Sequence, residues 1–302
     1  YESQLDSAFA YCKRNGIRVV KTGYVNDGSQ NIKRIDDDGT IHKEWHHGQY
    51  MVEHFRKVLE TAAKYNVGIV VHEPIKDTGL RRTYPNMLSR EGARGQEFNG
   101  FMPKDWNNKP NHTTILPFTR LLSSPMDYTP GIFNLKDYRY YSQDNREINP
   151  DHHIPSTISK ELALYVVIYA PVQMAADLPE HYEAHLDAFE FILDVPTDWE
   201  NTITLNGEIG EYITVVRKDM NSNDWYLGSI TNEDSRDIEI DLSFLESGLE
   251  YNATIYKDPN DGGWESKPEQ VIIETKIVKN SDDYKIVLPS GGGQAIKFSP
   301  LK

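Results

Sequence analysis

Val67-Gly68-Ile69-Val70-Val71-His72-Glu73 is a short run of mostly β-branched apolar residues that ends in a histidine and a glutamate. This length and composition predict a strand that is buried on both faces of a parallel sheet. The segment from about Gln49 to Tyr65 carries apolar residues at helical spacing and ends at Asn66, immediately before the strand. The sequence therefore predicts a helix that runs directly into a buried parallel strand.

The same order, a helix followed by a strand, occurs once more at the start of the chain. Leu5, Phe9 and Cys12 lie at helical spacing, and Asn15-Gly16 ends that helix before a strand that begins at Ile17. Alternating helices and strands indicate a β/α barrel or a doubly wound sheet. Only two or three further strand candidates precede residue 200, whereas a closed barrel takes roughly 250 residues. We expect residues 1–200 to form the C-terminal half of a (β/α)8 TIM barrel, with the first half outside this chain.

The pattern changes near residue 200. Before it, Ile158 to Ala176 predicts a long apolar helix interrupted by Pro171, and Leu186 to Leu193 is helical or irregular. After it, short alternating runs recur about every ten residues between Asn, Asp, Gly and Pro clusters, at residues 212–216, 225–230, 238–242, 251–256, 271–273, 284–288 and 293–298. This spacing is typical of an antiparallel β-sandwich. We expect such a domain over residues 201–302, with a hairpin turn at Gly291-Gly292-Gly293.

Composition excludes several classes of protein. Of 302 residues, 46 are acidic and 32 basic, and the net charge of −14 argues against a nucleic-acid partner. No apolar run approaches the ~20 residues that a membrane-spanning helix needs. Cys12 is the only cysteine, so an internal disulfide and a thiolate metal cluster are both excluded. A neutral or cationic ligand fits this chain better than a polyanion.

The candidate chemistry lies between residues 72 and 128. Glu73 ends a predicted strand, where barrel and open-sheet enzymes place their working groups, although such a carboxylate can also simply face solvent. Glu91 and Glu97 follow, six residues apart and interleaved with two arginines, which is also compatible with a surface ion-pair patch. The long irregular stretch from Tyr84 to Tyr128 favours an active-site loop over that alternative.

The segment from Asn26 to Trp45 is expected to be a polar loop. Asp36-Asp37-Asp38-Gly39 at its centre lacks the alternate spacing of an EF-hand, which favours a solvated turn over a calcium loop. His46 and His47 are either metal ligands or loop residues that order the rim of the barrel. Trp45 is a candidate platform for stacking against a sugar ring.

Several of these motifs together resemble one family of enzymes. The motifs are Lys21-Thr22-Gly23-Tyr24-Val25, His46-His47-Gly48-Gln49, Val71-His72-Glu73-Pro74, Thr78 to Asn86, Glu91 to Glu97, Asn111 to Arg120 and Pro125 to Gly131. Over about residues 1–200 the chain resembles glycoside hydrolase family 97, and within it the starch-utilisation α-glucosidases of Bacteroides. The sandwich is similar in kind to the family's C-terminal domain. The resemblance implies that this chain corresponds to the second half of the family's barrel and the C-terminal domain.

The resemblance also implies a calcium-dependent active site. Glu73 is similar to the family's strand-end glutamate, which binds calcium and helps to activate the attacking water in inverting members. Glu91 resembles a calcium ligand, and Glu97 resembles the general acid that protonates the departing oxygen and also contacts Ca²⁺. His72 is expected to hydrogen-bond substrate hydroxyls. The donor types fit, because calcium takes six to eight hard oxygen ligands.

Gly23 bears on the stereochemistry of the reaction. Retaining members of the family carry an aspartate nucleophile in a Lys-x-Asp-aromatic pattern, whereas Lys21-Thr22-Gly23-Tyr24 places glycine there. Glycine leaves room for a water molecule, which matches the inverting geometry. The resemblance places a second base upstream of Tyr1 and a further calcium ligand in the family's N-terminal domain. We therefore expect the 302-residue chain alone to hydrolyse maltose far more slowly than the intact protein.

Our leading hypothesis is a calcium-dependent inverting α-glucosidase that acts on starch-derived α-linked gluco-oligosaccharides. One alternative is a non-catalytic carbohydrate-binding or scaffold fragment, and another is a divalent-metal protein whose carboxylates are purely structural. The expected partners are these oligosaccharides and the N-terminal part of the same polypeptide, with no nucleic acid and no membrane insertion. The resemblance implies a periplasmic location.

Overall fold

The computed structural model describes residues 2–23, 32–101, 107–136 and 153–301, which fall into two compact units. The first unit comprises Tyr1–Ala93, Ser123–Asp127 and Ala170–Val172. The second unit comprises Arg94–Leu122, Tyr128–Tyr169 and Gln173–Lys302. The antiparallel strands of the second unit begin at Trp199, close to the expected change at residue 200. The division into domains of residues 1–200 and 201–302 stays a prediction.

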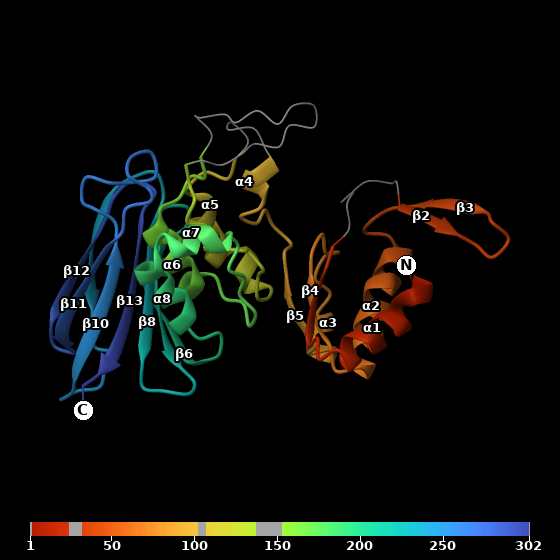
Figure 1. The fold of residues 1–302 in the computed structure, drawn as a ribbon, viewed down its shortest axis with the longest axis horizontal. Helices are drawn as coiled ribbons and strands as arrows, with labels where there is room; N and C mark the ends of the chain where they lie inside the picture. The colour runs from red at the N-terminus through yellow and green to blue at the C-terminus, as the bar shows by residue number, and fades with distance from the viewer. Residues whose placement is uncertain (1, 24–31, 102–106, 137–152, 302) are drawn as a thin grey trace. The chain divides into compact units, whose positions relative to one another are not determined.

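The first unit is built on a small parallel sheet, drawn in red to orange in Figure 1. Its strands β1 (Val19–Thr22), β4 (Gly68–Val71) and β5 (Met87–Arg90) lie in the order β1-β4-β5 and all run parallel. Its helices are α1 (Leu5–Arg14), which follows a 3₁₀ turn at Glu2–Gln4, α2 (Gln49–Lys64) and the short α3 (Leu80–Thr83). The predicted alternation of helices with parallel strands is confirmed.

Helix α2 packs against this sheet through the predicted apolar stripe. Phe55, Val58 and Leu59 on the helix are buried together with Ile69 and Val71 on β4. Burying a side chain of this size stabilises a fold by ~1.5–3 kcal/mol. The core therefore orients β4 so that the residues after Val71 leave the sheet at its carboxyl edge.

The expected loop between residues 26 and 45 is partly a hairpin, and the loop prediction is wrong there. Strands β2 (Ile32–Ile35) and β3 (Ile41–Glu44) pair antiparallel. Arg34 pairs with Glu44 and Asp36, so ion pairs support the hairpin. Its side chains are only partly buried, so the apolar alternation that marks a strand is missing. Residues 26–31 of the predicted loop lie outside the described residues.

The acidic centre of that segment forms the hairpin turn. The backbone N–H of Gly39 donates to the carbonyl of Asp36, and Asp38 accepts from the backbone N–H of Thr40. The interpretation of Asp36 to Gly39 as a turn is therefore confirmed.

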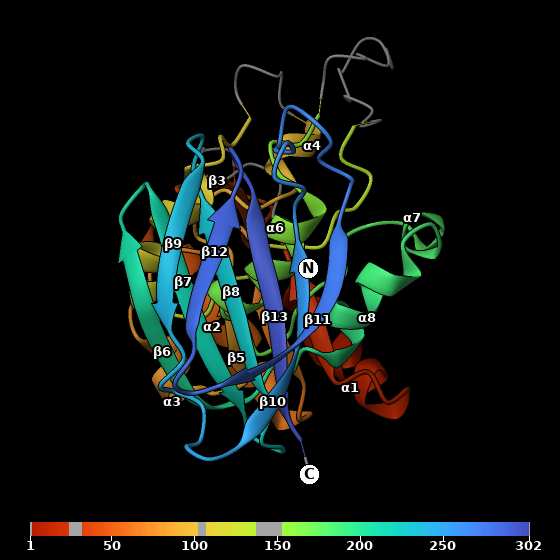
Figure 2. The ribbon, with the colours of Figure 1, turned by 90° about the vertical axis from the view of Figure 1, so that its left-hand side faces the viewer.

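The second unit is mainly antiparallel. Its strands are β6 (Trp199–Glu208), β7 (Tyr212–Asp219), β8 (Trp225–Thr231), β9 (Arg236–Asp241), β10 (Glu250–Lys257), β11 (Ile272–Lys279), β12 (Asp283–Leu288) and β13 (Gly293–Pro300). Six of them form a sheet in the order β11-β10-β13-β8-β7-β6, and β12 pairs with β9 in a second sheet. One buried apolar cluster joins the two sheets, with Ile240 and Ile286 on one side and Leu227 and Ile296 on the other (Figure 2).

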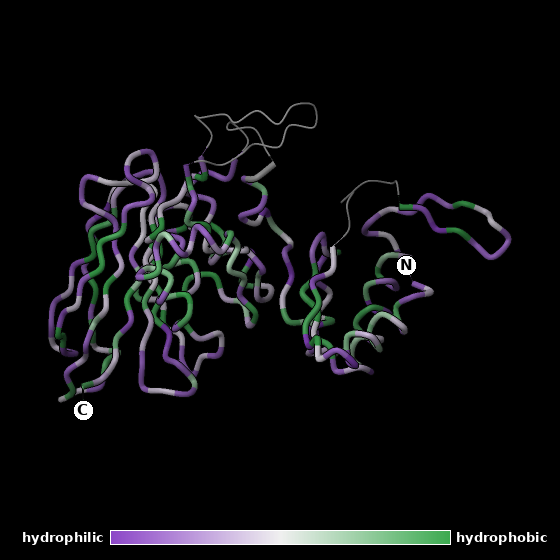
Figure 3. The backbone as a smooth tube through the Cα atoms, in the orientation of Figure 1, coloured by the Kyte–Doolittle hydropathy of each residue, from purple (hydrophilic) through white to green (hydrophobic). Residues whose placement is uncertain are grey.

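All seven predicted runs are strands, and two details of the prediction are wrong. Strand β6 was not predicted, because this edge strand is rich in polar residues and two register shifts against β7 break its alternation. The chain does turn at Gly291, whose φ is 63°. It connects β12 to β13, however, and these strands belong to different sheets, so the segment is not a hairpin. Figure 3 shows the hydrophobic residues gathered along the strands of this unit and hydrophilic residues in its turns.

Helix α6 (Ile158–Val167) covers the other face of the six-stranded sheet (Figure 1). A Cβ atom at Gly228 would lie 2.5 Å from the Ala163 carbonyl, and one at Gly293 would lie 2.5 Å from the Lys160 Cα. Only glycine therefore allows this close approach. The remaining helices are α4 (Phe98–Phe101), α5 (His112–Ile115), α7 (Pro179–Glu183) and α8 (Leu186–Asp194), with 3₁₀ turns at Leu116–Phe118 and Arg120–Leu122.

The long helix expected over Ile158 to Ala176 ends earlier, at Val167, so its predicted length is wrong. The hydroxyl of Thr157 caps its start by accepting from the Lys160 N–H, and Ile168 is already extended. Ile168 and Ala170 remain buried, so the apolar run reports burial rather than helix length. Among the described residues, no helix is long and apolar enough to cross a membrane.

Asp258 is a buried carboxyl group of the second unit, and burial raises its pKa to about 6. Its Oδ2 accepts hydrogen bonds from the Gly293 N–H at 2.9 Å and the Thr157 hydroxyl at 3.1 Å. Between the ordinary pKa of ~3.9 and the raised value, the folded state binds more protons than the unfolded state. The contribution of Asp258 to stability is therefore largest at acidic pH and falls as the pH rises through this window.

Asp258→Asn is expected to remove this pH dependence, because an amide does not titrate. The Tm of the wild type minus that of Asp258→Asn should fall between about pH 4 and about pH 6.5, as measured by thermal unfolding at closely spaced pH values. Asp234→Asn is the control, since the Asp234 side chain is 76% exposed. A difference that rises with pH over this range would contradict the expectation.

Candidate active site

The site of interest is the carboxyl edge of the sheet β1-β4-β5. The three parallel strands end at Thr22, Val71 and Arg90, so the residues that follow each strand emerge at one edge. These residues are Gly23 after β1, His72 and Glu73 after β4, and Glu91 after β5. The prediction that Gly23 and Glu73 lie at the same end of the sheet is confirmed.

Glu73 is held in an unusual backbone conformation. Its φ is 41°, in the left-handed region that costs a non-glycine residue ~1–3 kcal/mol and often marks functional sites. Its N–H faces the Glu91 Oε2 at 3.3 Å, and its carbonyl lies 2.6 Å from the Nε2 of the buried His46. Contacts on both sides of the residue thus fix the direction in which the Glu73 side chain leaves the strand.

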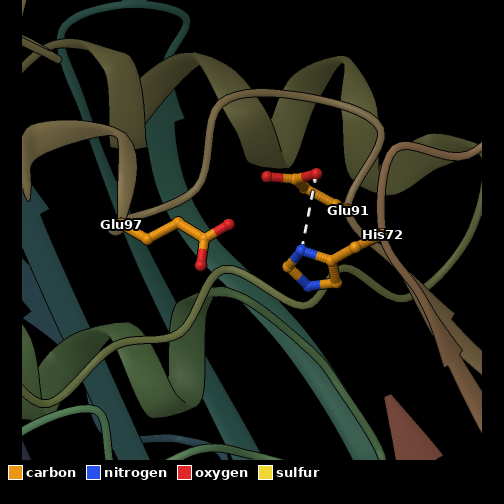
Figure 4. A group of neighbouring side chains, drawn as sticks. All are labelled: His72, Glu91 and Glu97. Atoms are coloured by element: carbon orange, nitrogen blue, oxygen red, sulfur yellow. Dashed lines mark ion pairs between the residues drawn. The ribbon is translucent and has the colours of Figure 1, made fainter. Parts of the chain in front are cut away.

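His72 lies between two carboxylates of the first unit. Its Nδ1 is 3.5 Å from the Glu91 Oε2, the ion pair marked in Figure 4, and its Nε2 is 2.6 Å from the Asp127 Oδ2. Lys21 on β1 approaches the same Asp127 oxygen at 3.3 Å. Asp127 is 1% exposed, and a buried carboxylate needs such partners to offset the loss of its hydration.

Asp127 was not among the residues assigned to the site from the sequence. Met126 forms an isolated parallel bridge with Arg90, so Asp127 occupies the same position after its bridge that Glu91 occupies after β5. A single bridged residue is too short for any periodicity to reveal. The motif Pro125-Met126-Asp127 was the available signal.

The predicted roles of His72, in binding substrate hydroxyls, and of Trp45, in stacking against a sugar ring, stay predictions. His72 is 3% exposed, and both of its ring nitrogens face carboxylates of the first unit. Trp45 is 52% exposed and packs edge-on against His47, with 5.4 Å between the ring centroids. An exposed indole can accept a sugar ring, and this stacking role stays a prediction.

Glu97 belongs to the second unit, where it immediately precedes α4. Its side chain, also labelled in Figure 4, is exposed. Five residues lie between it and Glu91 in the sequence. The convergence of Glu97 with Glu73 and Glu91 stays a prediction.

Glu73 and Glu91 are the residues of the first unit that were predicted to bind a metal ion at this edge. Both carry carboxylates, the hard ligands that calcium prefers, whereas the imidazole of His72 is a ligand for softer metals. The donor set therefore fits calcium better than zinc.

Gly23 makes room for the Glu73 carboxylate. A Cβ atom built on Gly23 would lie 3.0 Å from the Glu73 Oε2 and 3.4 Å from the His72 Cβ. A Cβ atom at position 23 would therefore crowd the Glu73 carboxylate, whereas its approach to His72 would be an ordinary contact. The space beyond the end of β1 thus lies directly beside the Glu73 side chain.

The chain matches two family models. The model described as glycoside hydrolase 97 matches residues 1–93, and the one described as glycosyl-hydrolase 97 C-terminal, oligomerisation, matches residues 198–299. The matches fall on the parallel first unit and on the strands β6 to β13.

The chain is also similar to individual proteins. It is 34% identical over 247 residues to a retaining alpha-galactosidase from Bacteroides thetaiotaomicron, covering 80% of this chain and 35% of that protein. It is 25% identical over 283 residues to a probable retaining alpha-galactosidase from Streptomyces bingchenggensis, covering 94% of this chain and 36% of that protein. The chain thus spans about a third of the length of these curated relatives.

The solved structures include more similar proteins. A glycoside hydrolase family 97 enzyme from Pseudoalteromonas sp. strain K8, in complex with acarbose, is 48% identical with a TM-score of 0.90. A variant of that enzyme in complex with panose is 47% identical with the same TM-score of 0.90. Each alignment covers 100% of this chain and 45% of the other. Because two models of one family match both of its parts and enzymes of that family share its fold and nearly half of its residues, this chain belongs to glycoside hydrolase family 97.

Proposed function

We propose that the protein is a calcium-dependent inverting α-glucosidase acting on starch-derived gluco-oligosaccharides. The observation that carries this proposal is Gly23, which puts no nucleophilic side chain at position 23 and has the Glu73 carboxylate beside its Cβ position. In an inverting mechanism a water attacks the anomeric carbon directly, with a carboxylate as its base. The curated relatives are named retaining enzymes, so stereochemistry is the point at which this chain is proposed to differ.

The similarity to the solved structures supports a glucoside substrate. The family 97 enzyme that was solved with acarbose and with panose shares 47–48% of the residues of this chain. The curated relatives named for galactosides share 25–34%. Panose is composed of glucose units, which favours glucosides over galactosides for this protein.

We also propose that residues 1–200 form the C-terminal half of a (β/α)8 barrel, to which the first unit belongs, followed by the sandwich domain of residues 201–302. Three parallel strands in sequential order support this, and the bridge between Arg90 and Met126 continues that order. In such a barrel the working residues stand at the carboxyl ends of the strands, where Gly23, Glu73 and Glu91 lie.

The proposed roles follow from these positions. Glu73 orients the attacking water and accepts its proton. It shares the role of base with the second base that the family resemblance places upstream of Tyr1. Glu97 donates a proton to the departing oxygen, and the bond between that oxygen and the anomeric carbon breaks as the bond to water forms. Glu73, Glu91 and Glu97 would hold the calcium ion, which supplies positive charge at the reacting centre when bound.

We propose a periplasmic location on the family resemblance alone.

The experiment that tests this function uses the complete natural protein. Proton NMR follows the first sugar released from maltose and from an α-galactoside, with and without EDTA. Release of β-glucose, lost with EDTA and restored by calcium, is the expected result. α-Glucose would refute inversion, and faster release of galactose would assign the activity named for the curated relatives. Sugar binding without turnover would favour the non-catalytic alternative.

Gly23→Asp is expected to lower kcat without changing the product anomer. The new carboxylate starts from a Cβ only 3.0 Å from the Glu73 Oε2, so the two acids repel each other and compete for a proton. NMR of the released glucose and the pH profile of kcat check this expectation. Gly23→Ala is the matched control, because it adds the Cβ without the charge. Release of α-glucose by Gly23→Asp would show that position 23 accepts a nucleophile.

A further inference from the structure

The side chain of Glu97 is exposed, but hydrogen bonds hold the residues before and after it in the chain. Gln96 and Asn99 are each 2% exposed, whereas Glu97 between them is exposed. The Gln96 N–H donates to the Tyr128 carbonyl at 2.8 Å. The Asn108 side chain donates to the Gly95 carbonyl at 2.9 Å, and the Asn108 N–H donates to the Asn99 side chain at 2.9 Å. All of these residues belong to the second unit.

A further attachment of this segment ends at a carboxylate that the proposed reaction does not use. Glu161 lies on α6 and is 0% exposed. Its Oε1 accepts from the Gln96 Nε2 at 2.9 Å, and its Oε2 accepts from the Gly131 N–H at 2.9 Å. Hydrogen bonds to an ionised carboxylate are about twice as strong as neutral ones. Burial raises the pKa of Glu161, while the hydrogen bonds from Gly131 and Gln96 act in the opposite direction.

The bond between Gln96 and Glu161 joins residues that are 65 positions apart in the sequence. Helix α4, which begins two residues after Gln96, does not need this bond in order to form. Helix α4 is a single turn, and the Asn99 N–H already bonds to the Gln96 carbonyl. The Gln96–Glu161 bond instead ties the residue before Glu97 to α6, which packs on the six-stranded sheet. The position of the Glu97 backbone is therefore set in part by α6 and the sheet on which this helix packs.

We propose that Gln96 and Glu161 are positioning residues that hold Glu97 in the place from which it protonates the departing oxygen. This inference rests on the proposed function, in which Glu97 is the general acid. A misplacement of ~1 Å in a reacting group can lower the rate by ~10²-fold. Gln96 and Glu161 act through the backbone of residue 97 and do not touch the substrate.

Gln96→Met tests the proposal in the complete natural protein, because methionine keeps the size of the side chain and removes its donor. The expected result is a kcat for maltose lowered by about 10- to 10²-fold, with less than about a 2-fold change for an aryl α-glucoside such as 2,4-dinitrophenyl α-glucoside. The reason is that a good leaving group departs with little need of a proton. Glu161→Gln should keep most of the activity, since the Gln96 amide can turn and accept a hydrogen bond from the new amide.

The control is Thr157→Ala on the same helix. It removes the hydroxyl that caps α6, at a stability cost of ~1 kcal/mol for the cap, and that also donates to Asp258, but it leaves both partners of the Gln96–Glu161 bond in place. Its activity on the two substrates should change in the same proportion. If Gln96→Met does not yield folded protein, Gln96→Asn takes its place, because the shorter amide withdraws the same donor. The same criterion applies to it.

Combination with Glu97→Gln separates positioning from a general loss of structure. Once the acid is removed, Gln96→Met should add less than about a 2-fold loss on maltose, because residues that act as a unit are not additive. A full additional loss in the double variant, or an equal loss on both substrates in the single variant, would overturn the inference. If Glu97→Gln alone spares maltose hydrolysis, the proposed role of Glu97 fails instead.

Discussion

Glu97→Gln is expected to lower kcat for maltose by about 10² to 10⁴-fold, the usual contribution of one acid–base group. Glutamine keeps the size of the side chain but has no carboxyl proton to donate to the departing oxygen. With 2,4-dinitrophenyl α-glucoside the loss should be much smaller, because the phenolate departs without protonation. Steady-state kinetics of the complete natural protein on both substrates measure the difference.

Glu180→Gln is the matched control for Glu97→Gln. Glu180 is an exposed glutamate in the first turn of α7, also in the second unit, and its replacement should leave both rates unchanged. An equal loss on the two substrates in Glu97→Gln would contradict the role of general acid. It would point instead to a role in binding or in holding calcium.

Glu73→Gln is expected to lower kcat by a similar ~10² to 10⁴-fold, but for both substrates alike. The reason is that every turnover needs an activated water, whatever the leaving group. The backbone of Glu73 is fixed by its contacts to Glu91 and His46, so glutamine should occupy the same place. Kinetics on maltose and on 2,4-dinitrophenyl α-glucoside check the pattern.

The exposed Glu53 on α2 provides the control, since Glu53→Gln changes the charge of the first unit by the same amount. A Glu73→Gln protein that loses activity only on maltose would mean that Glu73, rather than Glu97, is the acid. A loss of calcium-dependent thermal stabilisation in Glu73→Gln would add support for the metal role.

Most of the secondary structure could be predicted because it is encoded locally. The buried stripe of α2 and the β-branched run of β4 each follow a short period, and a short period is visible in one segment of sequence. The elements that were missed lack such a period. The hairpin β2–β3 is held by ion pairs, and β6 is a polar edge strand with two register shifts.

The residues of the candidate site also differ in whether a local sequence pattern reveals them. Glu73, Glu91 and Gly23 could be found because each directly follows a strand that the pattern predicts or a motif that the family resemblance supplies. Asp127 and Glu161 could not. Asp127 meets His72 across 55 residues of sequence, and Glu161 meets Gln96 across 65.

By itself the sequence determined the two structural classes that this protein combines, parallel β/α and antiparallel β. It also determined the strand ends at which carboxylates emerge. Those features depend on side-chain periodicity and on chain direction, which neighbouring residues specify. Only the tertiary structure decided which buried charges are paired, that Glu73 takes a left-handed backbone, and that its carboxylate lies beside Gly23. These depend on groups far apart in the chain, whose approach is set by packing of the sheet and its helices rather than by any local pattern.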